Sequence, residues 1–143
     1  MRTFFEITPY PLDLSALVQR VADPAAGAVA TFTGTTRNSF RGKAVLHLEY
    51  EVYGPLAEQV LRDIGTELAA QWPSLTGVAI AHRVGRVEVG EPSVMVAVSA
   101  PHRREALAAC ADGIDRLKRT LPVWKKEVFE DGEVWRENES PGR

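Results

Sequence analysis

The sequence contains very little that would direct it out of the cell or into a membrane. Its 143 residues include a single cysteine, Cys110, so no disulfide can form within the chain. No charged-then-apolar secretory segment opens the chain, and no run of 18 apolar residues occurs. We therefore expect a cytoplasmic protein.

A strong excess of one charge and the common ligand-binding motifs are also missing. The net charge at pH 7 is −2, which argues against nucleic acid or an acidic membrane as the main partner. The phosphate-binding patterns GxxxxGK(S/T) and GxGxxG, the nucleophile motif GxSxG and the pair CxxC do not occur. The three histidines, His47, His82 and His102, lack metal-ligand spacing. We expect neither a metal nor a cofactor, and anion binding only at local clusters.

The length and composition are those of one globular domain. Hydrophobic residues make up 45% of the chain and charged residues 25%. A domain of this length buries enough surface to fold without a disulfide or a metal. We expect a single domain over residues 1–143, in which the polar segment 137–143 is a frayed tail.

Alternating and β-branched segments predict most of the strands. Residues 27–34 are small and β-branched and predict a buried strand, and 44–53 alternates strongly and is expected to pair antiparallel with it. Asp131-Gly132 predicts a C-terminal hairpin. The predicted strands are 2–7, 27–34, 44–53, 78–89, 93–100, 123–129 and 133–135.

Helical periodicity predicts three helices. Asp13 is a plausible N-cap for a short first helix, Pro55 opens a second that runs to Trp72, and a third spans about Pro101 to Leu121. The apolar stripe of the third helix consists of Leu107, Cys110, Ile114, Leu117 and Leu121. These elements predict an α+β fold, with a mostly antiparallel sheet packed against about three helices.

Two basic clusters are candidates for anion binding. Arg37 opens the first, a polar loop that continues to Lys43 and could equally be a solvated surface loop. The second, His102-Arg103-Arg104, falls in the first turn of the third helix, where cations oppose the helix dipole. The unfavourable interaction of these cations with the helix dipole is offset if an anion binds at the helix start. The side chains could also simply extend into water.

A third basic cluster surrounds Trp124. The positive charge of Lys118 complements the partial negative charge at the C-terminal end of the third helix, and this structural role alone would explain the residue. Lys125 and Lys126 should point to opposite faces of a strand, so that one of them faces inward. Burial lowers the pKa of a lysine and suits it to proton transfer, but a purely structural role remains open. Cys110, on the apolar stripe, is expected to be a core residue and not a nucleophile.

The order of several segments resembles that of one enzyme family, the large subunit of molybdopterin synthase. The resemblance covers roughly residues 27–135, and the blocks TFTGxxRN and LKxxxPxWKxE together are specific. The matching segments are GAVATFTGTTRN, LEYEVY, AHRVGRVEVGE, SAPHRREA and LKRTLPVWKKE.

The resemblance implies a sulfurtransferase. The family adds two sulfurs to cyclic pyranopterin monophosphate, forming the dithiolene of molybdopterin. The sulfur arrives as a thiocarboxylate on the C-terminal Gly-Gly of a small ubiquitin-like partner, whose tail enters a pocket near two lysines. The implied catalytic residues are Lys118 and Lys125, and the implied substrate-binding residues are Thr35, Thr36, Arg37, His102, Arg103, Lys126 and Glu127.

The spacing along the third helix adds an expectation about assembly. His102 and Lys118 are 16 residues apart, which places their Cα atoms ~24 Å apart on one helix. One compact substrate can hardly touch both within one chain, so we expect a homodimer with shared pockets. This agrees with the heterotetramer of the family, a large-subunit dimer with a small subunit at each end. The alternative is a non-enzymatic dimeric sensor for a phosphorylated small molecule.

Overall fold

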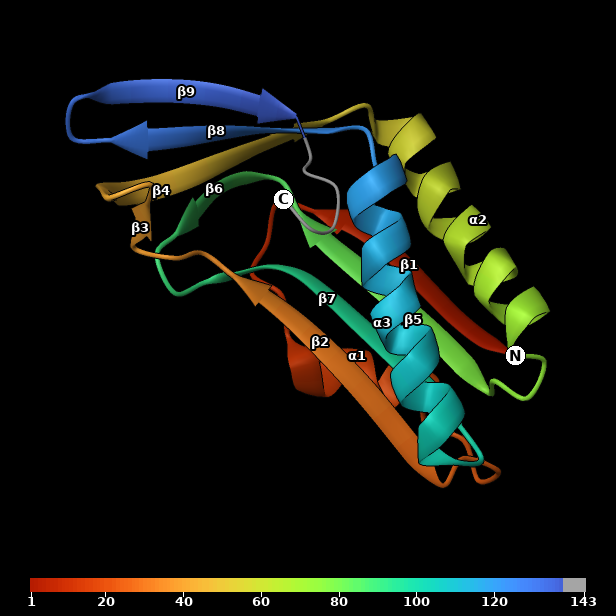
Figure 1. The fold of residues 1–143 in the computed structure, drawn as a ribbon. Helices are drawn as coiled ribbons and strands as arrows, with labels where there is room; N and C mark the ends of the chain where they lie inside the picture. Colours follow the sequence, from red (N-terminus) through yellow and green to blue (C-terminus); the bar gives the residue numbers. More distant parts are fainter. Residues whose placement is uncertain (138–143) are drawn as a thin grey trace.

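Two adjoining β-sheets form the framework of the computed structural model, which describes residues 1–137 (Figure 1). The first has the strand order β1-β5-β7-β2, where β1 and β5 are parallel and the other neighbours are antiparallel. Its strands are β1 (Arg2–Thr8), β5 (Gly77–Arg83), β7 (Pro92–Ala100) and β2 (Ala28–Thr35).

The second sheet is antiparallel and contains the C-terminal hairpin. Its strand order is β3-β4-β8-β9, and β6 pairs with β4. The strands are β3 (Ser39–Phe40), β4 (Lys43–Val52), β8 (Val123–Phe129), β9 (Gly132–Glu137) and β6 (Gly85–Glu88). The α+β class, the mostly antiparallel pairing and the hairpin at Asp131-Gly132 are thereby confirmed. Residues 138–143, which hold most of the predicted tail, lie outside the described part of the chain.

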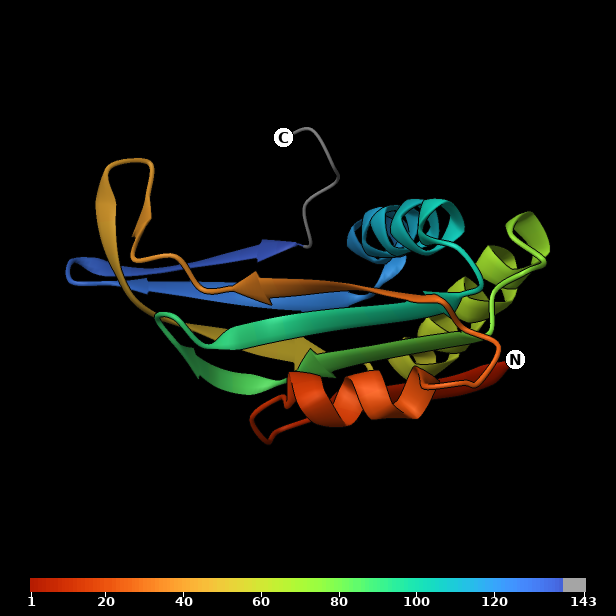
Figure 2. The same cartoon turned by 90° about the horizontal axis from the view of Figure 1, so that it is seen from below.

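The helices cover both faces of the first sheet. In Figure 2, α1 (Leu14–Val21) lies on one face and α3 (Arg103–Thr120) on the other. The remaining helix, α2 (Gly54–Gln71), packs beside α3. The predicted N-cap is present, because the Asp13 carboxylate accepts a hydrogen bond of 3.2 Å from the Ala16 amide.

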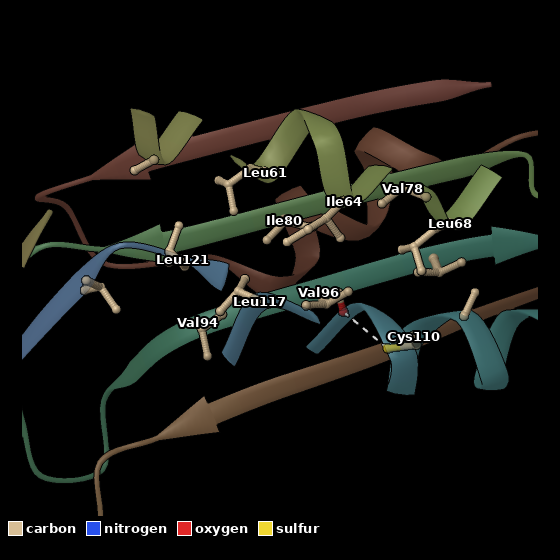
Figure 3. Close-up of a cluster of buried hydrophobic side chains, with 14 of the residues drawn as sticks. Leu61, Ile64, Leu68, Val78, Ile80, Val94, Val96, Cys110, Leu117 and Leu121 are labelled. Carbon is tan, nitrogen blue, oxygen red and sulfur yellow. Dashed lines mark hydrogen bonds between the residues drawn. The ribbon is translucent and has the colours of Figure 1, made fainter. Parts of the chain in front are cut away.

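Strand alternation divides the core into two layers. Val78 and Ile80 of β5 belong to the large cluster under α2 and α3, whereas Ala79 and Ala81 belong to a smaller cluster under α1. Figure 3 shows side chains of α2 and α3 packing on the central strands of the first sheet. Within residues 1–137, none of the helices is long and apolar enough to cross a membrane.

Two strand predictions are wrong because the chain changes sheets. The segment predicted as one strand over 78–89 breaks where Gly85 adopts a φ of +80°, so β5 stays in the first sheet and β6 joins the second. The segment 44–53 forms β4 but does not pair with β2. The Thr36 backbone instead forms hydrogen bonds with the backbones of Glu91 and Gly90. These two bonds hold the chain where it passes from the first sheet into the second.

Two burial predictions are also wrong. The predicted buried strand is β2, an edge strand whose Val29 side chain is 42% exposed. Leu107, assigned to the apolar stripe of α3, is 61% exposed, because Ala106 and Ala109 occupy the core-facing positions of that turn. Cys110 is buried, as predicted. The outer edge of β2 and the outer side of α3 thus present apolar side chains to the surface.

Candidate active site

A cavity of about 220 Å³ lies where the two sheets meet. We call it the junction cavity. Its walls come from β2 and β7 of the first sheet, from β3, β4 and β8 of the second, and from the end of α3. The polar and charged residues singled out in the sequence that line it are Thr35, Thr36, Arg37, Lys118, Lys125 and Glu127.

Three different structural elements bring the cationic side chains of the junction cavity together. Arg37 follows the end of β2, Lys118 lies in the last turn of α3, and Lys125 lies on β8. Arg37 and Lys125 are far apart in the sequence, and only the meeting of the two sheets makes them neighbours around one space. Three cations around a small cavity suit it to binding an anion and to stabilising negative charge that develops during a reaction.

A buried carboxylate and a buried hydroxyl accompany these cations. Glu127, two residues after Lys125 on β8, is 2% exposed and forms an ion pair with Arg136 of β9. Thr36 is 4% exposed, and its hydroxyl has no hydrogen-bond partner among the described residues. Thr36 lines the cavity, and a polar group of a ligand bound there would supply the missing hydrogen-bond partner.

Tyr50 of β4 lines the cavity next to Lys125 of the neighbouring strand β8. Its Cα pairs with that of Lys125, and burial together with the nearby Glu127 charge raises the pKa of the Tyr50 phenol, against a hydrogen bond with Ser93. The phenol is therefore neutral at physiological pH.

His82 lies behind this wall and is a neutral residue. Its Nδ1 lies 2.7 Å from the carbonyl oxygen of Arg83 and must carry a proton, since a carbonyl only accepts. Its ring meets that of Tyr50 edge-on, with centroids 5.2 Å apart. Burial, assisted by the charge of Lys118, lowers the pKa of His82 to about 4. His82 therefore adds no positive charge near neutral pH.

Lys126 lies on the opposite face of the second sheet and does not line the junction cavity. Its ammonium is 3.2 Å from the Glu49 carboxylate and 3.5 Å from that of Glu133, and it lies over the Trp135 ring. The hydrogen bond with Glu49 is the largest cause that raises the pKa of Lys126. Because adjacent strand residues point to opposite faces, this placement gives no support to the expectation that Lys126 contacts the substrate.

His102 and Arg103 are at the far end of α3 from Lys118. His102 occupies the N-cap position and Arg103 is the first helical residue, and both side chains are exposed. Neither lines the junction cavity. The structure therefore brings together six of the nine expected site residues and leaves these two and Lys126 outside the cavity of the single chain.

Several residues of the cavity wall were not among those expected from the sequence. They are Phe32, Gly34, Ser39, Phe40, Val45, Leu48, Tyr50, Ser93 and Val94. Phe32, Gly34, Leu48 and Tyr50 lie within segments that match the family, but apolar and small residues of this kind are common in cores and carry no charge that marks them as site residues. Within the described part of the chain, no group of three or more His, Cys, Asp or Glu side chains is arranged to hold a metal ion.

Comparisons with known proteins point to a single family. The MoaE protein family model matches residues 7–120. The chain is 53% identical to a molybdopterin synthase catalytic subunit of Oryza sativa subsp. indica, over 89% of this chain and 65% of that protein. It is 44% identical to the corresponding Bacillus subtilis protein, over 92% of this chain and 83% of that one. The chain spans only 36–65% of the length of several curated relatives that it matches.

A solved structure agrees with these matches. The crystal structure of molybdopterin synthase from Staphylococcus aureus superimposes with a TM-score of 0.89 at 39% identity. The superposition covers 92% of this chain and 96% of that one.

Proposed function

The chain belongs to the MoaE protein family, and on this premise we propose that it is the catalytic subunit of a molybdopterin synthase. In this role it transfers sulfur from a thiocarboxylated carrier protein to cyclic pyranopterin monophosphate. The observation that carries the proposal is the junction cavity, in which Arg37, Lys118 and Lys125 surround one space. The proposal retains the cytoplasmic location expected from the sequence.

The cavity residues divide into binding and catalytic roles. Arg37 holds the substrate phosphate, and the hydroxyls of Thr35 and Thr36 are placed to contact the same ligand. Lys118 and Lys125 stabilise the negative charge that develops on the reacting groups and move protons. These two lysines act on a sulfur that the protein itself does not supply, because Cys110 is buried in the core.

The chemistry proceeds in two equivalent rounds. The thiocarboxylate sulfur of the carrier forms a bond to a substrate carbon while the carbon–oxygen bond there breaks. The displaced oxygen keeps the electron pair of that bond and takes up a proton, and the carrier stays attached through a thioester. Water then adds to the thioester carbonyl, and the bond between that carbonyl and sulfur breaks. The carrier leaves as a carboxylate and the sulfur remains on the substrate. A second thiocarboxylated carrier repeats the step at the neighbouring carbon and completes the dithiolene.

A second copy of the chain supplies His102 and Arg103 in this proposal. They lie ~24 Å along α3 from Lys118, beyond the reach of a substrate held in the same chain's cavity. Val29 and Phe32 on the edge strand β2 and Leu107 on α3 are exposed apolar side chains that a second copy can bury. The assembly is then a homodimer with one carrier at each end, a heterotetramer.

A binding-only sensor of phosphorylated small molecules does not account for this site. Such a protein needs cations for the phosphate, but it has no need for Lys118 and Lys125 beside a buried carboxylate. We therefore retain the enzyme as the proposed function.

The direct test is a reconstituted reaction. The purified chain is incubated with thiocarboxylated carrier and pterin precursor, and dithiolene product is measured; the same carrier with an ordinary C-terminal carboxylate is the control. We expect product only with the thiocarboxylate. Tight binding of the precursor without any product from the thiocarboxylated carrier would contradict the enzyme proposal and favour the sensor.

A further inference from the structure

Arg136 is a half-buried arginine that does not line the junction cavity. It lies on β9, and its Cα is paired with that of Lys125 across the β8–β9 hairpin. Residues in such a pair point to the same face of the sheet, so two cationic side chains leave the hairpin side by side. Like charges in directly opposed positions destabilise a sheet unless a nearby anion compensates them.

Glu127 is that anion. Its carboxylate forms the ion pair with Arg136 Nε, although the two residues are diagonal neighbours in the hairpin. Glu127 lies on the same face of β8 as Lys125, with the two Cα atoms about 7 Å apart along the strand. A carboxylate as deeply buried as Glu127 is very unfavourable without a cation beside it.

The choice of partner for Glu127 decides the charge of the junction cavity. If Arg136 holds the carboxylate, the negative charge of Glu127 is balanced within the hairpin and does not reduce the positive charge of the cavity. If Arg136 is removed, Glu127 becomes an uncompensated negative charge in the same wall as Lys125. The net positive charge available to a phosphate or a thiocarboxylate then falls.

We propose that Arg136 is a positioning residue, which neutralises the buried Glu127 and so preserves the positive charge of the junction cavity. The proposal relies on the proposed function for the identity of the substrate. It relies only on the contacts of Arg136 and Glu127 for the arrangement of charge.

A second contact ties Arg136 to the cavity wall. Its guanidinium carbon lies 4.7 Å from the centroid of the Phe40 ring, and Phe40 lines the junction cavity from β3. Arg41 lies over the same ring at 5.0 Å. Arg136 thus connects the strand that carries Lys125 with the short β3–β4 hairpin that follows Arg37.

The test measures binding of inorganic phosphate by calorimetry to the full chain and three variants. Arg136→Met removes the compensating charge, and Arg136→Met/Glu127→Gln removes both charges. Arg86→Met is the matched control, because Arg86 is an exposed arginine of β6 that pairs with Glu88. We expect Arg136→Met to weaken phosphate binding about tenfold, as one uncompensated charge close to the anion does. The double variant should bind phosphate more tightly than Arg136→Met, and Arg86→Met should not differ from the parent.

Three outcomes overturn the proposal. Equal losses in Arg136→Met and in the double variant mean that Arg136 does not act through Glu127. An equal loss in Arg86→Met means that only overall charge matters. If Arg136→Met does not fold, the double variant decides alone, since a tenfold loss of phosphate affinity in it contradicts the proposal. If phosphate binding follows the expected pattern but the parent transfers no sulfur, the proposed function fails and the role of Arg136 stands.

Discussion

Substitutions at the two ends of α3 should affect the kinetics of the enzyme in different ways. Lys118 lines the junction cavity, whereas Arg103 is exposed at the start of the same helix. A lysine that stabilises charge only in the transition state affects the rate of the chemical step. An arginine that binds a phosphate throughout the reaction affects the substrate concentration that is needed.

We predict that Lys118→Ala lowers the single-turnover rate of dithiolene formation ~10²–10³-fold, the usual cost of removing one preorganised charge. Lys125→Ala should also be damaging, and Arg103→Ala should mainly raise the substrate concentration at half-maximal rate. The assay uses saturating thiocarboxylated carrier, and circular dichroism checks the fold. A near wild-type rate for Lys118→Ala, together with a large loss for Arg103→Ala, would show Lys118 to be only a helix C-terminal charge.

We expect that Cys110, unlike Lys118, can be replaced without loss of sulfur transfer, because its side chain has no access to the reaction. Its side chain is buried under α3 and its sulfur lies 3.9 Å from the Val96 carbonyl oxygen. Burial raises the pKa of the thiol to about 11, so very little thiolate exists at neutral pH. Cys110→Ala should cost about 1–2 kcal/mol in urea unfolding and leave sulfur transfer intact. Lost turnover in the folded variant would reveal a sulfur relay through this residue.

At the scale of secondary structure, the close approach of α2 to β1 depends on a glycine. A Cβ at Gly65 would lie 2.5 Å from the Phe5 ring, a contact that requires the helix or the ring to move. Alanine favours a helix over glycine by about 1 kcal/mol, but overpacking typically costs about 1–3 kcal/mol.

We therefore predict that Gly65→Ala lowers the free energy of unfolding, measured in urea, in spite of its higher helix propensity. Gly113→Ala on α3 is the matched control, since its Cβ would meet Leu68 at 3.3 Å and should cost less. Phe5→Leu in the Gly65→Ala background should restore part of the loss. A stabilised Gly65→Ala protein would mean that helix propensity, and not packing, dominates at this position.

Whole-molecule architecture is tested by mixing two defective chains. If a second copy supplies Arg103 to the cavity that holds Lys118, a mixed dimer of Arg103→Ala and Lys118→Ala contains one intact site. Coexpressed variants should regain about one quarter of the wild-type rate at low substrate, because half of the dimers are mixed and half of their sites are intact. Activity no higher than the mean of the two parent variants would place both residues in the same site of one chain.

Local patterns in the sequence account for most of the helices and strands. Asp13 caps α1 and Asp131-Gly132 turns the last hairpin, as expected from spacing and residue type. The cationic residues that line the junction cavity were identified from charge pattern and family resemblance. The helix cap and the hairpin turn depend on interactions within a few residues, which the sequence displays directly.

Long-range pairing was decided by the tertiary structure alone. Gly85 divides one apolar run between two sheets, and contacts of Thr36 direct β4 away from β2. Whether Leu107 faces the core or solvent depends on which neighbours α3 meets, and a helical stripe of apolar residues does not contain that information. The position of Lys126 outside the cavity is also a tertiary effect. Strand alternation separates Lys126 from Lys125, but only the packing of the sheets decides which of the two faces inward. The pairing of Glu127 with Arg136 likewise exists only once β9 has folded back on β8, because it joins residues whose positions are fixed by strand register.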